Sequence, residues 1–147
     1  LFELVAVLLV VGILAVVAVP QLVTTQSLTL PSLKAQLVAS IRYTQSLSRS
    51  RGQRYRINFT AGSYQITDMG GAPIVQPNTA STAAIVVAPA ILGGYNPPLT
   101  GSYVAFDGRG VPYVSATTAL GSPATITLTS GTDSASLAIA PETGRVQ

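Results

Sequence analysis

The sequence predicts an α+β fold, in which a long N-terminal helix, hydrophobic at first and then amphipathic, packs against an antiparallel β-sheet domain. An unbroken apolar run extends from Leu4 to Val19, and apolar residues then recur at helical spacing from Leu33 to Leu47. From Tyr55 onwards apolar and polar residues alternate, as they do in half-buried strands. A chain of 147 residues has room for one modest globular core beside such a helix. We therefore expect a hydrophobic helix at residues 1–24, an amphipathic helix at residues 25–52 and an antiparallel β domain at residues 53–147.

The apolar run has the length of a membrane-spanning helix. From Leu1 to Val23 a helix would measure about 34 Å, compared with about 30 Å for the hydrocarbon core of a bilayer. The run is apolar on every side, so a helix here must lie in lipid or be surrounded by other protein. A secretory signal has a basic flank, whereas this run follows the acidic Glu3, and we expect it to belong to the mature protein.

Glu3 is the only charged residue before Lys34. The helix dipole stabilises a carboxylate at a helix N-terminus, but placing it in lipid still costs as much as about 3 kcal/mol. Its burial therefore requires a cation, and the nearest one is an α-amino group of the same chain or of a neighbour. The alternative is an ordinary membrane anchor that leaves Glu3 in the headgroup region.

Two residues weaken the helix within and after the run. Pro20 lacks an N–H and clashes with the carbonyl group of Val16, and Gly12 costs a helix about 1 kcal/mol relative to alanine. The segment between them is predicted to lose helical hydrogen bonds easily.

The amphipathic helix is expected to begin near Pro31, which suits a first helical turn, and to end at Gly52. One face carries apolar and small polar residues, namely Leu33, Leu37, Ile41, Thr44 and Leu47 or Ser48. The other face carries the basic residues Lys34, Arg42, Arg49 and Arg51. Basic residues in a last helical turn are stabilised by the helix dipole, so their position has a structural explanation.

The remaining chain is predicted to form strands joined by turns and loops. We expect a hairpin at residues 55–66, a loop at 76–83, one strand at 84–92 with a bulge or an edge at Pro89, and a loop at 93–98. Beyond these we expect a strand at 103–106, a tight turn at 107–110, a return at 111–114, and a hairpin that pairs 125–129 with 135–139.

Composition argues against catalysis. The chain has no cysteine and no histidine, which excludes disulfides, thiolate metal sites and catalysis by a histidine or cysteine side chain. The five acidic residues are far apart in the sequence, and no motif for phosphate or metal binding is present. We expect no enzyme activity, no cofactor and no metal.

The N-terminal residues carry a family resemblance. Leu1-Phe2-Glu3-Leu4, the apolar run, Gly12-Ile13-Leu14-Ala15 and Ala18-Val19-Pro20 resemble the start of bacterial type IV pilins and type II secretion pseudopilins. The resemblance implies a precursor held in the inner membrane, cleaved by a prepilin peptidase, methylated at its new amine, and then extracted by the pilus assembly machinery into a cell-surface filament.

This resemblance assigns assembly roles to Phe2, Glu3, Gly12 and Pro20. It implies that Glu3 pairs with the N-terminal amine of a neighbouring subunit and that Pro20 ends or kinks the buried helix. It also implies that the stretch from Gly12 to Pro20 loses helical hydrogen bonds in a filament.

The globular part is similar to the GspH/FimT group of pseudopilins and minor pilins. The similar residues are Leu33-Lys34-x-x-Leu37, the segment from Ser46 to Gln53, the strand from Tyr55 to Phe59, Phe106-Asp107-Gly108-Arg109-Gly110, and Gly144-Arg145-Val146. This similarity implies a pilin fold. Members that take up DNA have a second basic residue in the terminal Gly-Arg motif, where this chain has Gln147.

The sequence therefore predicts a structural subunit that polymerises with identical subunits into a type IV pilus-like filament through its hydrophobic helix. Two alternatives stay open: a GspH-like minor pseudopilin of a type II secretion pseudopilus, and a FimT-like DNA-binding minor pilin. A candidate polyanion patch is formed by Arg49, Arg51, Arg54 and Arg56, with Tyr55 among them. We favour the helix-end explanation of these arginines over DNA binding, because basic surfaces that bind nucleic acid are usually larger.

Overall fold

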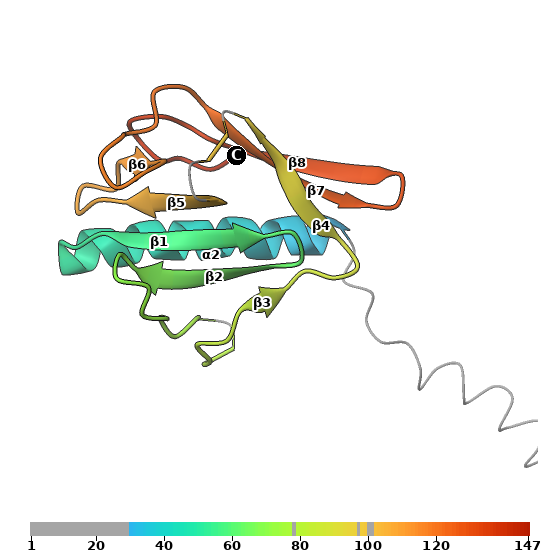
Figure 1. The fold of residues 1–147 in the computed structure, drawn as a ribbon, viewed down its shortest axis with the longest axis horizontal. Coiled ribbons are helices and arrows are strands. Elements are labelled where there is room, and N and C mark those ends of the chain that lie inside the picture. Colours follow the sequence, from blue (N-terminus) through green and yellow to red (C-terminus); the bar gives the residue numbers. More distant parts are fainter. Residues whose placement is uncertain (1–29, 78, 97, 100–101) are drawn as a thin grey trace, which may run out of the picture.

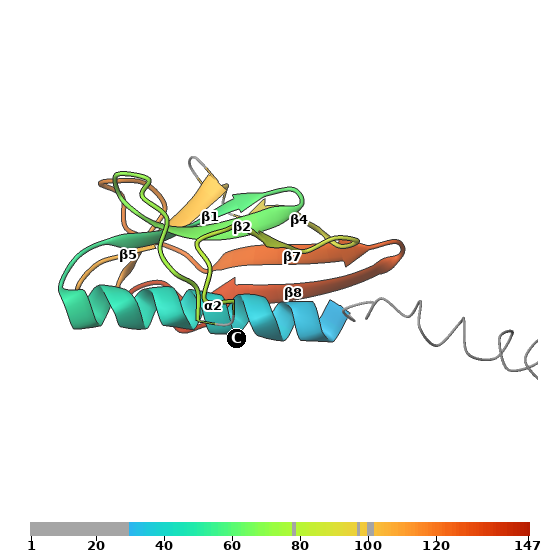
Figure 2. The same ribbon diagram turned by 90° about the horizontal axis from the view of Figure 1, so that it is seen from below.

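The computed structural model describes residues 30–77, 79–96, 98–99 and 102–147. In this part of the chain one helix, α2 (Leu30–Arg51), lies against two antiparallel sheets (Figure 1, Figure 2). The predicted α+β class is confirmed. The five-stranded sheet has the order β3-β2-β1-β5-β6, with β3 (Ile85–Val86), β2 (Ser63–Asp68), β1 (Tyr55–Thr60), β5 (Tyr103–Phe106) and β6 (Pro112–Tyr113). The three-stranded sheet has the order β4-β7-β8, with β4 (Ile91–Asn96), β7 (Ala124–Ser130) and β8 (Asp133–Ile139).

The α2 helix buries one face along its whole length. Its first turn contains Pro31, and Gly52 follows its last residue with a φ of +63°, a left-handed conformation that ends helices and favours glycine. The buried residues are Leu33, Leu37, Ser40, Ile41, Thr44, Leu47 and Ser48, which include every position that the helical spacing predicts. The hydroxyl groups of Thr44 and Ser48 donate to carbonyl oxygens one turn earlier, so their burial leaves no hydroxyl donor unpaired.

The first hairpin supplies the centre of the five-stranded sheet. Thr60 pairs with Ser63, so the connection between β1 and β2 is the two-residue loop Ala61-Gly62. Tyr55, Ile57 and Phe59 alternate into the core, as the period of two predicts. On its other edge β1 pairs antiparallel with β5.

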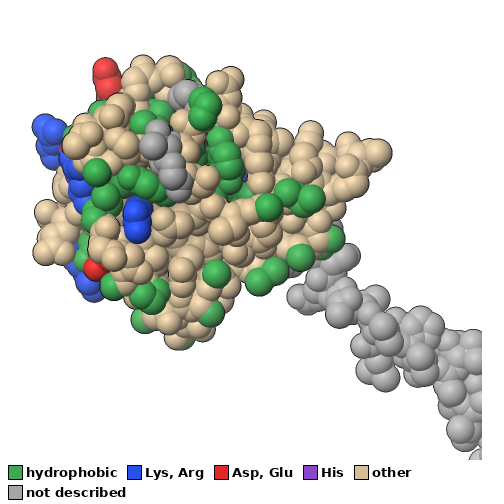
Figure 3. Space-filling model, in the orientation of Figure 1, with side chains coloured by type: hydrophobic (Ala, Val, Ile, Leu, Met, Phe, Trp, Pro, Cys, Tyr) green, Lys and Arg blue, Asp and Glu red, His purple; other side chains and the backbone are tan. Residues whose placement is uncertain are grey.

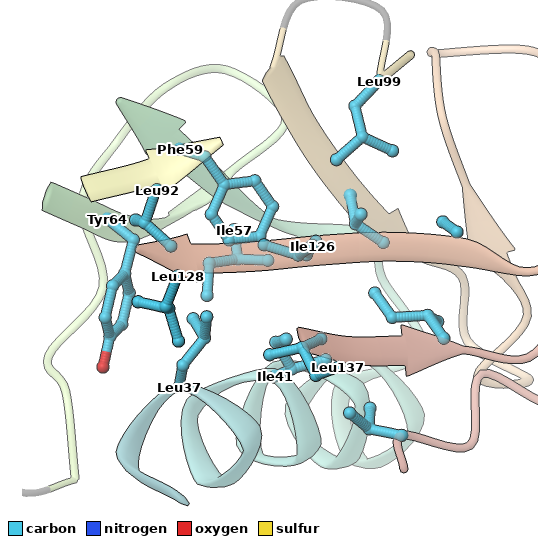
Figure 4. Packing of buried hydrophobic residues seen from close by; sticks show 14 of the residues in the cluster. Leu37, Ile41, Ile57, Phe59, Tyr64, Leu92, Leu99, Ile126, Leu128 and Leu137 are labelled. Atoms are coloured by element: carbon cyan, nitrogen blue, oxygen red, sulfur yellow. The ribbon is translucent and has the colours of Figure 1, made fainter. Parts of the chain in front are cut away.

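The second hairpin covers the N-terminal half of α2. β7 and β8 pair from Ala124 and Ile139 at one end to Ser130 and Asp133 at the tip. The inward side chains are Ala124, Ile126, Leu128, Leu137 and Ile139, whereas the outward positions of β7 are threonines. Figure 4 shows Leu37 and Ile41 of α2 pointing towards the inward residues of both sheets. One continuous core therefore lies between the helix and the two sheets.

The prediction of a single strand at residues 84–92 is wrong. Ile85 and Val86 pair with the five-stranded sheet, whereas Ile91 and Leu92 pair with β7 in the other sheet. Between them the chain turns at Ala88-Pro89, where Pro89 has no N–H to donate to a neighbouring strand. We call the exposed residues of this segment, Ala84, Val86, Ala88, Pro89 and Ile91, the crossover surface.

The prediction of a loop at residues 93–98 is wrong for residues 93–96. Residues 93–96 belong to β4, and the register of pairing with β7 shifts between Gly93 and Asn96. Gly94 has a φ of +61°, and a Cβ added to it would lie 2.9 Å from Oγ1 of Thr127. The two glycines therefore allow a bulge within a strand instead of ending it.

A buried hydrogen bond connects α2 to the five-stranded sheet. The hydroxyl oxygens of Ser40 and Tyr64 are 3.1 Å apart, and both residues are at most 1% exposed. Burial raises the pKa of the Tyr64 hydroxyl, and the hydrogen bond to Ser40 opposes this shift only in part. The phenol is therefore neutral in the folded protein and pairs with the serine in the core.

We expect Tyr64→Phe and Ser40→Ala each to lower the free energy of unfolding by about 1 to 3 kcal/mol, because each leaves a buried hydroxyl unpaired or removes its bond. The double variant should lose little more than either single variant. Chemical denaturation of the full chain in mild detergent, followed by circular dichroism, measures both effects. Tyr103→Phe, on the outer face of the sheet, is the control, and additive losses in the double variant would contradict a direct Ser40–Tyr64 interaction.

Candidate functional site

The expected assembly residues Phe2, Glu3, Gly12 and Pro20 lie outside the described residues. Among the residues that are described, no helix is both long and apolar enough to cross a bilayer. The hydrophobic helix at 1–24 and the roles of its residues stay predictions. The candidate polyanion arginines, by contrast, all lie in described segments.

The four arginines gather where α2 ends and β1 begins. Arg49 and Arg51 lie in the last turn of the helix, and the reversal of the chain at Gly52 brings Arg54 and Arg56 to the start of β1. Figure 3 shows Lys and Arg side chains concentrated at this end of the domain in the view drawn. We call Arg49, Arg51, Arg54 and the 81% exposed side chain of Arg109 the arginine end.

Arg54 and Arg56 stack on tyrosines from the neighbouring strands. The Cζ atom of Arg54 is 4.0 Å from the ring centroid of Tyr113, and that of Arg56 is 5.1 Å from the ring centroid of Tyr103. A side-chain nitrogen of Arg54 also donates to the carbonyl oxygen of Ala116, and Nε of Arg56 donates to Oγ1 of Thr67 at 3.1 Å. Both guanidinium groups are thus held on the outer face of the sheet.

Tyr55, which the sequence places among these arginines, has a different role. It is 4% exposed and turns into the core, where Nη1 of Arg51 donates to its hydroxyl at 3.3 Å and Cζ of Arg51 lies 5.8 Å from its ring centroid. This hydrogen bond raises the pKa of the Arg51 guanidinium, which is already above the physiological range. The four arginines therefore do not share one interleaved aromatic stack.

One face of α2 binds the backbone of two distant segments. Nη2 of Arg42 donates to the carbonyl oxygen of Val146 at 3.2 Å, and Nε of Arg49 donates to that of Arg109 at 3.2 Å. Between them, Nε2 of Gln45 donates to the carbonyl oxygens of Gly110 at 2.8 Å and Thr143 at 2.7 Å. The residues are three or four positions apart in the helix, so they form one row of donors.

Two glycines allow this close contact. At Gly110, where φ is +84°, an added Cβ would collide with the guanidinium group of Arg49. At Gly144, where φ is +65°, it would meet the side chain of Gln45 and the carbonyl oxygen of Gly110 at 2.8 Å. Backbone and helix therefore approach each other more closely than any side chain would permit.

Asp107 organises the turn that α2 holds. It is 9% exposed, and its Oδ1 accepts from the backbone N–H groups of Arg109 and Val111, both at 2.9 Å. Burial alone would raise the pKa of the Asp107 carboxyl, but the N–H groups of Val111 and Arg109 and the Arg109 charge together hold it below its ordinary value. Oδ2 lies 3.4 Å from Nε of Arg109, which forms the one ion pair found among the described residues.

The side chains of the arginine end make contacts within the domain. No group of three or more acidic, histidine or cysteine residues that could hold a metal occurs in the part of the chain that the structure describes. The candidate arginines donate to carbonyl and hydroxyl oxygens or stack on rings, and the charge of the guanidinium groups at the surface stays available to a partner.

A family model described as type II transport protein GspH matches residues 35–143. The chain belongs to the GspH family. Two crystal structures of the type IV minor pilin FimU from Pseudomonas aeruginosa, in space groups P65 and P21, are similar to it with a TM-score of 0.57 and 15% identity. The similarity covers 80% of this chain and 90% and 86% of those chains, which confirms the pilin-like fold. No curated protein matches this chain.

The structure shows what the motifs that carry the family resemblance do in the domain. In this GspH-family domain the segment Phe106–Gly110 is the turn held by Arg49 and Asp107, and Gly144 lies against Gln45. Sequence reasoning missed Gln45 as a donor and Tyr103 and Tyr113 as stacking partners. Tyrosines at outward positions of two predicted strands were the available signal, but strand order was needed to place them beside β1.

We expect Asp107→Asn to lower the free energy of unfolding of this GspH-family domain by about 1 to 3 kcal/mol near neutral pH, because a charged acceptor of two N–H groups is lost. The pKa of Asp107 is lower in the folded protein than in the unfolded chain. The stabilisation that the Asp107 carboxylate provides is therefore complete at pH values above its pKa in the unfolded chain, which is about 4. It is lost as the pH falls through the lower pKa that this group has in the folded protein.

Denaturant unfolding of the full chain in mild detergent between about pH 2 and pH 7 measures this difference. The matched control is Asp133→Asn, which changes an exposed residue at the tip of the β7–β8 hairpin. A stability loss for Asp107→Asn that does not shrink below about pH 4 would contradict the role given to the carboxylate.

Proposed function

We propose that this chain is a structural, non-enzymatic subunit that polymerises into a type IV pilus-like filament through its hydrophobic N-terminal segment. The observation that carries the proposal is the packing of α2 on two antiparallel sheets in a GspH-family domain. That helix begins directly after an N-terminal sequence with an apolar run long enough to cross a membrane. The similarity to FimU, described as a type IV minor pilin, supports the same class of protein.

In this proposal the chain is first anchored in the inner membrane and then extracted into the filament, where the apolar segments of many subunits pack together. Exchanging lipid for neighbouring apolar helices changes little hydrophobic burial. The pairing of Glu3 with a neighbouring N-terminal amine would then select the register, because an unpaired carboxylate in that core is costly. Identical subunits, a prepilin peptidase and the assembly machinery are the partners that the proposal requires.

A minor pseudopilin of a type II secretion pseudopilus is the second candidate. It is favoured by the description of the matching family as a type II transport protein and by the similarity to a minor pilin. The two candidates share the assembly chemistry of Glu3 and differ in abundance, since a minor subunit occurs in trace amounts within a fibre built from another protein.

DNA binding by Arg49, Arg51, Arg54 and Arg56 stays a prediction that we do not favour. Each of these arginines has a partner within the domain, so its position has an explanation without a ligand. Salt-sensitive DNA binding that falls when all four are neutralised would establish the alternative.

We expect Glu3→Ala and Glu3→Gln to leave membrane insertion intact and to stop polymerisation, because the apolar run is unchanged and the partner of the neighbouring amine is lost. The measurement is membrane fractionation together with the yield of sheared fibres. Glu142→Gln, an exposed residue of the globular domain, is the control. Normal fibres from either Glu3 variant would contradict the assembly role of this residue.

Abundance separates the two candidates. We expect electron microscopy and mass spectrometry of material sheared from the cell surface to find long fibres that consist mainly of this chain. Trace amounts in fibres built from another protein would favour the minor-subunit candidate, and restriction of the chain to the membrane would favour the secretion pseudopilus.

A further inference from the structure

The crossover surface carries two of the three large hydrophobic side chains that are exposed among the described residues. Val86 and Ile91 are 64% and 55% exposed, and Ala84, Ala88 and Pro89 between and beside them are exposed too. The outward positions of three other strands carry polar residues instead: Arg56, Asn58 and Thr60 on β1, Ser63 and Gln65 on β2, and Thr125, Thr127 and Thr129 on β7. The crossover surface departs from this pattern, and exposed apolar groups of this kind mark interaction sites.

The surface is held in a fixed shape. Its inward neighbours Ile85, Val87 and Leu92 are at most 8% exposed and belong to the core. The backbone N–H of Val87 donates to the carbonyl oxygen of Gly62 at 3.0 Å, and that of Leu92 donates to the carbonyl oxygen of Ala61 at 2.8 Å. The β1–β2 turn therefore supports the crossover from beneath, and a partner would bind a preformed surface.

Charge is distributed unequally between the two ends of the domain. No Asp, Glu, Lys or Arg occurs between residues 69 and 106, the segment that contains the whole crossover surface. The arginine end lies at the other end of the domain, and Figure 3 shows hydrophobic side chains over the β3–β4 connection and Lys and Arg side chains away from it. Two copies that met through their arginine ends would bring like charges together, whereas head-to-tail contact avoids this repulsion.

The position of the surface indicates its partner. The crossover surface and Leu30, the first residue of α2, lie at the same end of the domain (Figure 1). If the hydrophobic segments of several subunits pack together, as in the proposed function, the end of the domain that holds the crossover surface lies next to a neighbouring subunit. The stacked guanidinium group of Arg54 on Tyr113 is suited to an apolar neighbour, because guanidinium is weakly hydrated and packs on flat surfaces.

We propose that the crossover surface is a docking site for a second copy of this chain, which contributes its arginine end in a head-to-tail contact. The inference rests on the proposed function and adds to it the globular surface through which subunits meet. A head-to-tail contact uses different surfaces on the two partners and, when its rotation does not close a ring, generates an open helical filament. Subunits already held together by their N-terminal segments would present the two surfaces to each other at a high effective concentration, so even a weak contact would form.

Cysteine crosslinking tests the geometry directly, because the full chain contains no cysteine. Val86→Cys is placed in one tagged copy and Thr117→Cys in a second, differently tagged copy, and a short bismaleimide is added to whole cells. Thr117 is exposed and follows Ala116, whose carbonyl oxygen binds Arg54 at the arginine end. We expect a dimer that carries both tags, and no dimer from either cysteine variant alone.

Other results overturn the inference. A dimer of Val86→Cys with itself would show a symmetric contact, and its attachment to a different protein would assign the surface to that partner. The absence of any crosslink in both membranes and fibres would show that the surface is not a contact between subunits.

Substitution tests its contribution to assembly. The double variant Val86→Thr with Ile91→Thr replaces both side chains by threonine, the residue at the outward positions of β7. We expect the amount of the chain in sheared fibres to fall about tenfold. Val75→Thr is the matched control, because Val75 is 53% exposed and lies outside the crossover surface. Equal yields for the double variant and this control would overturn the inference. Failure of the proposed function would appear separately, as normal assembly of the Glu3 variants.

Discussion

The contact on which the domain depends is the packing of one helix face against two sheets that are not hydrogen-bonded to each other. Leu37 and Ile41 contribute to a core that both sheets share, so the burial of α2 joins the sheets together with the crossover and the hydrogen bond from Leu92 to the β1–β2 turn. The polar side of the helix also connects distant segments, because Gln45 and its neighbours donate to backbone groups of the 107–110 turn and of the C-terminal segment. The helix is therefore both a core element and the scaffold for the arginine end.

Elements with local pairing could be predicted from the sequence. The buried face of α2 follows from a spacing of three and four residues, and the two hairpins follow from alternation around short turns. The segment at 84–92 was predicted wrongly because an apolar run indicates burial without indicating which sheet it joins. Gly93 and Gly94 were assigned to a loop because the sequence does not distinguish a glycine bulge inside a strand from the end of that strand.

The sequence shows which arginines lie near one another, but it does not show which groups they contact. The clustering of Arg49, Arg51, Arg54 and Arg56 is visible in the sequence, and in the structure all four lie where α2 ends and β1 begins. Their partners are carbonyl oxygens and tyrosine rings contributed by β5, β6 and the turns around them. The carbonyl partners leave no sequence signal, because every residue has a carbonyl group. The tyrosines are visible in the sequence, but only the strand order places a given tyrosine beside a given arginine.

The connection between Arg42 and Val146 has a consequence for the order of folding. These residues are 104 positions apart, and the same long separation applies to much of the contact between α2 and β8. The two hairpins need only local chain closure, whereas the helix meets its final partners after the intervening chain has been arranged, which slows folding towards milliseconds or seconds. During that interval the apolar face of α2 is exposed to other chains. If residues 1–24 hold the subunit in a membrane, as proposed, this folding is completed before any filament contact forms.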